Sequence, residues 1–253
     1  MESDTPAGRP RPVYRNFIFE PRRRFLFAYV PKVGCTNWKS VLRHLAGHDD
    51  YLNPRLAHDR ANGGLRYLDL SEGPDRALLR NPEVPKYAFV RDPYSRTLSA
   101  YLNKIASRLP LQPASDTDDH FTRVTRAIDG FRQRKLDTAA HPEVSFEVFL
   151  LWLRASLSPW CDDEHWQKQS ALLRWRGVEY SFVGRFERLA EEAPLLLEKM
   201  GATIPFPSQR DVKFAPTNAT DRQDAFYTPR ARRLVNKLYA PDFANFGYEM
   251  HED

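Results

Sequence analysis

The sequence predicts an α/β fold with one main domain. Three short apolar runs begin near residues 25, 87 and 180 of this 253-residue chain, and each can form a buried strand. Each run precedes a segment whose apolar residues recur with helical spacing. Strands that alternate with helices form βαβ units, whose strands lie parallel. We therefore expect a central, mainly parallel sheet flanked by helices, and a hydrophobic content of 42% is enough for one substantial core.

The first strand, at residues 25–30, leads through a loop at 31–37 into a helix. One face of this helix carries apolar residues at i, i+3, i+4 and i+7, namely Trp38, Val41, Leu42 and Leu45. Thr36 or Asn37 can cap the helix, because a short polar side chain accepts a hydrogen bond from the free N–H groups of the first turn. The loop is therefore expected to end at a helix N-terminus.

The loop at 31–37 has the composition of an anion site. A helix N-terminus presents unpaired N–H groups and the positive end of the helix dipole, and both favour a phosphate or a sulfate. Gly34 lets the backbone come close to the anion, and Lys32 adds a mobile positive charge. Cys35 lies in the same loop, and we expect it to be a small loop residue because no partner base is near it in the sequence.

The alternation continues along the chain. Residues 48–83 are rich in Asn, Gly, Asp and Arg and are predicted to form loops around a short apolar piece at 65–70. A second strand at 87–90 precedes a helix in which Asp92 is the N-cap and Pro93 the first residue. Further helices are expected at 120–135, 146–156, 186–200 and 228–239, and a third strand at 180–183.

A second basic site follows the second strand. Arg91 lies at the carboxyl end of that strand, while Arg96 and Ser99 are three residues apart and share a face of the next helix. Ligands of open α/β sheets bind beyond the carboxyl ends of the strands. Arg91 could instead pair with a core carboxylate. Two basic sites at strand ends of one sheet nevertheless favour a ligand with two separate anionic groups.

Four segments, in order, resemble motifs of sulfotransferase family 2. The segment 27–39 resembles the family's 5′-phosphosulfate loop, and the run Arg-Asp-Pro at 91–93 with Arg96 and Ser99 resembles its 3′-phosphate motif. The other two segments are Tyr-Ser-Phe-Val-Gly-Arg-Phe-Glu at 180–187 and Leu-Tyr-Ala-Pro-Asp-Phe-Ala-Asn-Phe-Gly-Tyr at 238–248. In particular, the chain resembles the carbohydrate sulfotransferases of the chondroitin, dermatan and HNK-1 type, and we expect it to be a soluble member of bacterial type.

This resemblance implies a P-loop-like, three-layer α/β fold at residues 25–253, after a flexible basic leader at 1–24. It also implies the donor 3′-phosphoadenosine 5′-phosphosulfate as co-substrate, and transfer of its sulfuryl group to a hydroxyl of a carbohydrate. The residues expected to hold the donor are Pro31, Lys32, Val33, Gly34, Cys35, Thr36, Asn37, Arg91 and Ser99. The sequence lacks the Gly-x-x-x-x-Gly-Lys-Ser/Thr loop of nucleotide hydrolases, which favours a sulfonucleotide over ATP.

Two residues are expected to do the chemistry. Lys32 would stabilise the charge that grows on the leaving nucleotide, and His165 would take the proton of the acceptor hydroxyl. His165 resembles the His-Trp pair of the family's acceptor region, and the competing bases are Asp162, Asp163 and Glu164. Trp166 and Arg185 are expected to bind the acceptor. Arg185 replaces the lysine of the family motif, which keeps the charge but changes its geometry.

Composition limits the partners. The net charge of +5 favours anionic ligands, but the basic residues are scattered, so no nucleic acid is expected. Two cysteines imply no disulfide framework and a reducing, cytoplasmic location, and no Cys/His set predicts a metal. No stretch is long enough to span a membrane, while peripheral association with one stays open. The alternatives are a small-molecule or lipid-linked acceptor with the same donor, or a non-catalytic module that binds nucleotides or polyanions.

Overall fold

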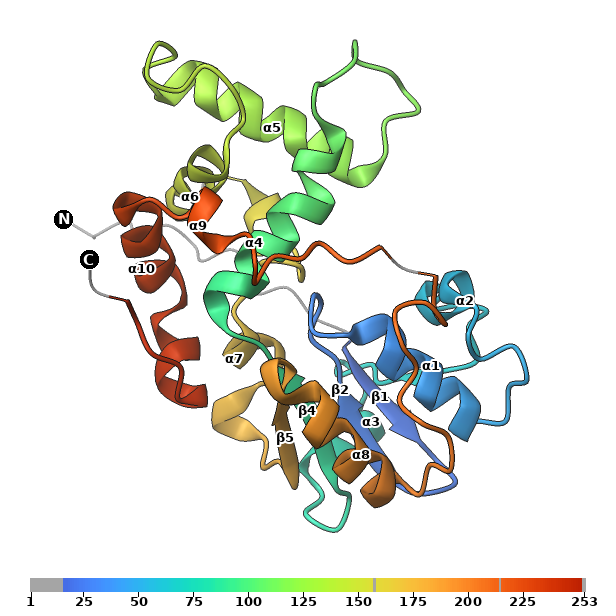
Figure 1. Cartoon of the computed structure of the whole chain (residues 1–253). Coiled ribbons are helices and arrows are strands. Elements are labelled where there is room, and N and C mark those ends of the chain that lie inside the picture. Colours follow the sequence, from blue (N-terminus) through green and yellow to red (C-terminus); the bar gives the residue numbers. More distant parts are fainter. Residues whose placement is uncertain (1–15, 157, 214, 252–253) are drawn as a thin grey trace, which may run out of the picture.

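The computed structural model describes residues 16–156, 158–213 and 215–251, and within them a five-stranded sheet forms the centre of the fold (Figure 1). The strands are β1 (Phe17–Glu20), β2 (Phe25–Ala28), β3 (Arg66–Tyr67), β4 (Lys86–Val90) and β5 (Phe182–Arg185). Their order across the sheet is β3-β1-β2-β4-β5. β4 lies parallel to both β2 and β5, whereas β1 lies antiparallel to both β2 and β3.

The sheet is thus mixed, and the expectation of a mainly parallel sheet was wrong. The cause is β1, which lies inside the segment 1–24 that was expected to be a flexible leader. All four residues of β1 are buried, and a turn at 21–24 is too short to return the chain for a parallel strand. The ordered fold therefore begins before residue 25, while residues 1–15 of the expected leader lie outside the described residues.

Helices lie on both flanks of the sheet. The α-helices are α1 (Cys35–Leu45), α2 (Pro54–His58), α3 (Gly73–Arg80), α4 (Pro93–Lys104), α5 (His120–Lys135), α6 (Phe146–Ala155), α7 (Gln169–Leu172), α8 (Leu189–Met200), α9 (Gln223–Phe226) and α10 (Pro229–Phe246). Short 3-10 helices are η1 (Ala106–Arg108), η2 (Pro159–Asp162), η3 (Trp175–Gly177) and η4 (Phe186–Arg188). Among the described residues, no helix combines the length and the apolar character needed to cross a membrane.

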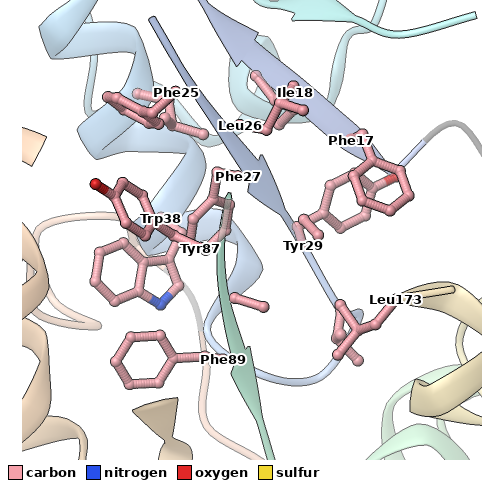
Figure 2. Packing of buried hydrophobic residues seen from close by; sticks show 14 of the residues in the cluster. Phe17, Ile18, Phe25, Leu26, Phe27, Tyr29, Trp38, Tyr87, Phe89 and Leu173 are labelled. Carbon is pink, nitrogen blue, oxygen red and sulfur yellow. The ribbon is translucent and has the colours of Figure 1, made fainter. Parts of the chain in front are cut away.

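Buried apolar side chains form two clusters, one around the sheet and one around α4. In the first, Trp38 of α1 is fully buried, with its ring centroid 5.2 Å from Phe27 and 4.8 Å from Phe89 (Figure 2). In the second, α4 packs with α5, α6 and α10, which gather on the side of α4 away from the sheet (Figure 1). Because α4 begins at the end of β4 and enters the second cluster, it joins the two parts of the molecule.

Several boundaries differ from those expected. The segment 48–83 contains α2, β3 and α3 as well as loops, and α10 extends to Phe246 rather than ending near 239. β5 begins two residues later than expected, so that Gly184 and Arg185 belong to the strand. Gly184 is needed there because a Cβ atom on it would lie 2.4 Å from Cζ of Phe89. The ring of Phe89 therefore occupies the space that a side chain at position 184 would need.

Candidate active site

A cavity of about 450 Å³ lies where β2 and β4 end. The loop after β2 and the start of α1 form one wall, and Arg91, directly after β4, forms another. The described residues that line it are Pro31, Lys32, Gly34, Cys35, Thr36, Asn37, His58, Arg91, Ser99, Asn103, Lys104, His165, Phe186, Leu189, Phe206, Pro207, Ser208, Gln209, Pro216 and Thr217. This lining includes two lysines and an arginine but no carboxylate, so the cavity suits an anion.

The N-terminus of α1 opens into this cavity. Its N-cap is Gly34, in the left-handed region at φ 64°, and no side chain caps the helix. The expected caps have other partners, since Thr36 Oγ1 lies 2.9 Å from Nε2 of His58 and Asn37 donates to the carbonyl of Pro207 at 2.8 Å. The N–H groups of the first turn are therefore left for a ligand, as in other anion sites at helix N-termini.

Lys32 stands beside this helix N-terminus. Its backbone has a positive φ of 72°, an uncommon conformation for a residue with a Cβ, and its Nζ donates to Oδ1 of Asn103 at 2.9 Å. Burial lowers the pKa of Lys32 to about 7, and the positive charges of Lys104, Arg91 and Arg96 add to this shift. A bound anion would supply the negative charge that Lys32 needs to stay protonated.

Arg91 faces the same cavity from the end of β4. Its Nε donates to Ser95 Oγ at 3.0 Å and its Nη1 to the carbonyl of Lys32 at 3.0 Å, while its guanidinium lies 4.4 Å from the centroid of Phe186. Burial lowers the pKa of Arg91 to about 10, so the side chain stays charged at neutral pH. A guanidinium has five N–H donors, and the remaining ones can bind a phosphate.

The backbone of Arg91 is held by a buried amide. Oε1 of Gln169 accepts from the Arg91 N–H at 2.9 Å, and Nε2 of Gln169 donates to the Arg91 carbonyl at 2.7 Å. Gln169 is itself fixed, because the buried carboxylate of Asp242 accepts from the N–H groups of Gln169 and Ser170. Asp242, in the segment 238–248, thus helps to fix the position of Arg91 at the cavity, because it holds Gln169 of α7.

Ser99 faces the cavity one turn of α4 after Ser95. Its hydroxyl lies 2.9 Å from that of Thr217, and Thr220 Oγ1 accepts a long hydrogen bond from Arg91 at 3.4 Å. The segment that carries both threonines therefore lies over the two residues expected to bind a 3′-phosphate. Both serine and threonine hydroxyls can donate to an anion.

His165 also lines the cavity, and its ring contacts a carboxylate. Its Nδ1 lies 2.7 Å from Oδ1 of Asp163, and Oδ2 of Asp163 lies 2.9 Å from Nε2 of His120. Burial opposes the charge on Asp163, but hydrogen bonds from His165 and His120, together with the charge interaction with His165, outweigh it and lower its pKa to about 2. Burial also lowers the pKa of His165, so its ring is neutral at pH 7 and can accept a proton.

Comparison with known proteins identifies the group to which this arrangement belongs. The profile of the sulfotransferase family matches residues 15–249. The chain belongs to the sulfotransferase family. It is 34% identical to carbohydrate sulfotransferase 14 of Mus musculus over 98% of this chain and 64% of that protein. The same protein of Homo sapiens is 33% identical over the same shares, and carbohydrate sulfotransferase 11 of Danio rerio is 29% identical over 93% of this chain and 68% of that protein.

The chain thus spans less than two thirds of the mouse and human relatives. No solved structure is significantly similar to it. Within the described residues, no group of three or more His, Cys, Asp or Glu side chains is arranged to hold a metal.

Three of the residues expected from the family motifs do not line the cavity. Val33 and Trp166 are each 2% exposed and pack in the two apolar clusters, and the Trp166 indole donates to the carbonyl of Trp160 at 3.0 Å. Arg185 donates to the carbonyls of Phe246 and Gly247 at the end of α10. Of the competing bases, Glu164 is occupied by Tyr29 and Arg60 at 3.1 and 3.2 Å.

The cavity also contains residues that the sequence analysis missed. His58 belongs to α2, in a segment expected to be loop, and burial lowers its pKa to about 4, so it is neutral. Asn103 and Lys104 come one turn after Ser99, at a helical spacing that could have indicated them. The apolar wall combines Phe186 and Leu189, where η4 passes into α8, with Phe206 from the loop after α8, and the sequence analysis did not connect these residues with the donor.

Proposed function

We propose that this chain transfers the sulfuryl group of 3′-phosphoadenosine 5′-phosphosulfate to a hydroxyl of a carbohydrate acceptor. The observation that carries the proposal is one cavity whose lining brings together Lys32 and the N-terminus of α1 with Arg91 and Ser99. A donor with phosphate groups at two places fits two such anion sites. Family membership and relatives named carbohydrate sulfotransferases support both the donor and the acceptor class.

The parts of the donor are assigned to the walls of the cavity. The loop at 31–37 acts in a P-loop-like way, with Lys32, Gly34 and the first turn of α1 around the 5′-phosphosulfate. Arg91 and Ser99 hold the 3′-phosphate. Phe186, Leu189 and Phe206 offer an apolar wall for the adenine. The lining has no carboxylate that could hold Mg²⁺ for nucleotide hydrolysis, which also favours the sulfonucleotide.

The transfer needs a base, an in-line acceptor and a cation at the leaving oxygen. The acceptor oxygen forms a bond to sulfur while the bond from sulfur to the bridging 5′-phosphate oxygen breaks, releasing adenosine 3′,5′-bisphosphate. The hydroxyl proton goes to Nε2 of His165, because Nδ1 is engaged by the ionised Asp163. Lys32 stabilises the charge on the leaving oxygen. A histidine paired with a carboxylate beside the donor cavity favours catalysis over a purely binding module.

Nucleotide binding tests the donor assignment. Adenosine 3′,5′-bisphosphate and 5′-AMP are titrated by calorimetry against the wild type, Arg91→Ala and, as control, Arg188→Ala, whose side chain is 60% exposed. The wild type and the control should prefer the bisphosphate, and Arg91→Ala should lose about 10-fold or more of that preference, as expected for a charged hydrogen bond of about 1.5–3 kcal/mol. Equal affinity of the wild type for both nucleotides would refute the donor assignment.

Turnover of labelled donor with a panel of desulfated chondroitin, dermatan and heparan chains, simple sugars and a lipid-linked sugar tests the acceptor class. The polysaccharides should accept the label. Transfer to the lipid-linked sugar alone would instead support the alternative acceptor, and no transfer by a protein that binds the bisphosphate would support a non-catalytic module.

A further inference from the structure

Arg96 is an almost completely enclosed positive charge near the cavity, although it does not line it. Its side chain is 1% exposed. All three of its nitrogens donate to backbone carbonyls: Nε to Pro31 at 3.1 Å, Nη1 to Gln167 at 2.7 Å and Nη2 to Glu164 at 3.1 Å. One side chain on α4 therefore binds two segments that are far apart in sequence.

Those two segments carry the two residues that act on the sulfuryl group. Pro31 directly precedes Lys32, and Glu164 and Gln167 enclose His165 in sequence. The guanidinium is rigid and planar, so its N–H groups fix the directions in which the carbonyls lie. Moving either segment would break at least one charge-assisted hydrogen bond, and each is worth about 1.5–3 kcal/mol.

The partners of Arg96 are unusual for a buried charge. A charged side chain removed from water is costly unless it is paired. Arg96 forms no ion pair among the residues that the structure describes, and the groups that accept its hydrogen bonds are neutral carbonyls. An apolar residue in its place would leave these three carbonyls without their donor, whereas the planar guanidinium holds all three at once. The arrangement therefore suggests that the geometry of the two segments, and not only their packing, depends on this charge.

We propose that Arg96 is a positioning residue, which sets the separation between the Lys32 ammonium and the His165 imidazole. The inference rests on the proposed function, because it assigns Lys32 and His165 to the leaving oxygen and to the acceptor hydroxyl. A displacement of about 1 Å at such a pair can reduce a rate about 10²-fold. Binding of the 3′-phosphate depends on other contacts, since Gln169 holds the Arg91 backbone and Ser99 belongs to α4 itself.

The variants Arg96→Lys and Arg96→Gln separate positioning from stability. Lysine keeps the charge, but its ammonium has one nitrogen where the planar guanidinium has three, so it cannot bond all three carbonyls in the same geometry. The matched control is Arg43→Lys on α1. Arg43 is also 1% exposed and is bonded to the Gly63 carbonyl and to Asp50, but it lies outside the cavity lining. Thermal melting temperature is measured for each protein, together with the Kd for adenosine 3′,5′-bisphosphate and kcat with the panel polysaccharide that turns over fastest.

Arg96→Lys should lower kcat by about 10²-fold while its Kd for the bisphosphate changes by less than about threefold. Arg43→Lys should lower the melting temperature without changing kcat. If Arg96→Lys and Arg96→Gln keep the wild-type kcat, or lose bisphosphate affinity and kcat by equal factors, the positioning role is refuted. That failure would leave the proposed function intact. A wild type that transfers sulfuryl to no member of the panel would instead refute the proposed function, and the inference with it.

Discussion

The Nδ1 atom of His165 lies 2.7 Å from Oδ1 of Asp163, and the same oxygen accepts the backbone N–H of His165 at 2.9 Å. The carboxylate therefore fixes both the ring and the turn that carries it. Because Asp163 remains ionised to a pH of about 2, it holds the proton on Nδ1 and leaves Nε2 free to accept one. Of the three acidic neighbours in the sequence, Asp163 is thus the hydrogen-bond partner of His165, the proposed base.

Asp163→Asn should lower kcat by about 10²–10⁴-fold, because the amide no longer favours the tautomer that has a free Nε2. His165→Ala should have a similar effect, and the double variant should be little worse than either single one. Glu164→Gln is the control, since its carboxylate is engaged by Tyr29 and Arg60. Steady-state kinetics with labelled donor measures kcat for the wild type and these four variants. A large loss in Glu164→Gln with full activity in His165→Ala would transfer the role of base to Glu164.

The lowered pKa of Lys32 predicts an alkaline limb in the rate profile. Burial and three neighbouring cations bring the pKa of Lys32 to about 7. Lys32 acts as the charged form, so kcat/KM, which reports the free protein, should fall as the pH rises through about 7. Lys32→Arg should be less active but should lose this limb, because a guanidinium stays charged.

The neighbouring Lys104 supplies an independent check on that limb. Replacing Lys104 by Gln removes one positive charge and should raise the pKa of Lys32, so the limb should move to higher pH. The full pH profile of kcat/KM is measured for the wild type and both variants. A limb that stays in place in both variants would belong to another group.

The cavity shows why some residues of this site could be predicted from the sequence and others could not. Lys32 and Arg91 could be predicted because Lys32 lies in the loop after β2 and Arg91 directly follows β4, and parallel strands of one sheet end at the same edge. The N-cap Asp92 was predicted from its local pattern and does accept from the Ser95 N–H. By contrast, Trp166 follows His165 directly but points into the second core, because successive residues in a turn need not share a surface.

The predictions that were wrong concern features that depend on contacts between residues distant in sequence. β1 was missed because its four residues lie inside a Pro- and Arg-rich segment, and only pairing with β2 and β3 fixes them as a strand. Thr36 was expected to cap α1, yet it bonds to His58 of α2, which lies in a segment without apolar periodicity. Local propensity decides a cap only where no tertiary partner competes for the same hydroxyl.

Gln169 should matter for both stability and nucleotide binding. Gln169→Leu removes two hydrogen bonds and leaves the buried N–H and carbonyl of Arg91 unpaired, at about 1–3 kcal/mol for each group. The free energy of unfolding in urea should fall accordingly, and binding of adenosine 3′,5′-bisphosphate should weaken. Gln133→Leu, at an exposed position of α5, serves as control. A variant as stable as the wild type would show that the two hydrogen bonds between Gln169 and the Arg91 backbone contribute little to stability.

The strand position of Gly184 makes a prediction about the core alone. In Gly184→Ala the new methyl group would lie 2.4 Å from Cζ of Phe89, a buried ring that also contacts Trp38 and Phe182. Overpacking of this kind costs about 1–3 kcal/mol, because the ring or the strand must move. Gly177→Ala is the matched control, since a Cβ there meets no atom within 4 Å. Urea unfolding should separate the two variants by at least about 1 kcal/mol; equal stabilities would mean that β5 and Phe89 rearrange without cost.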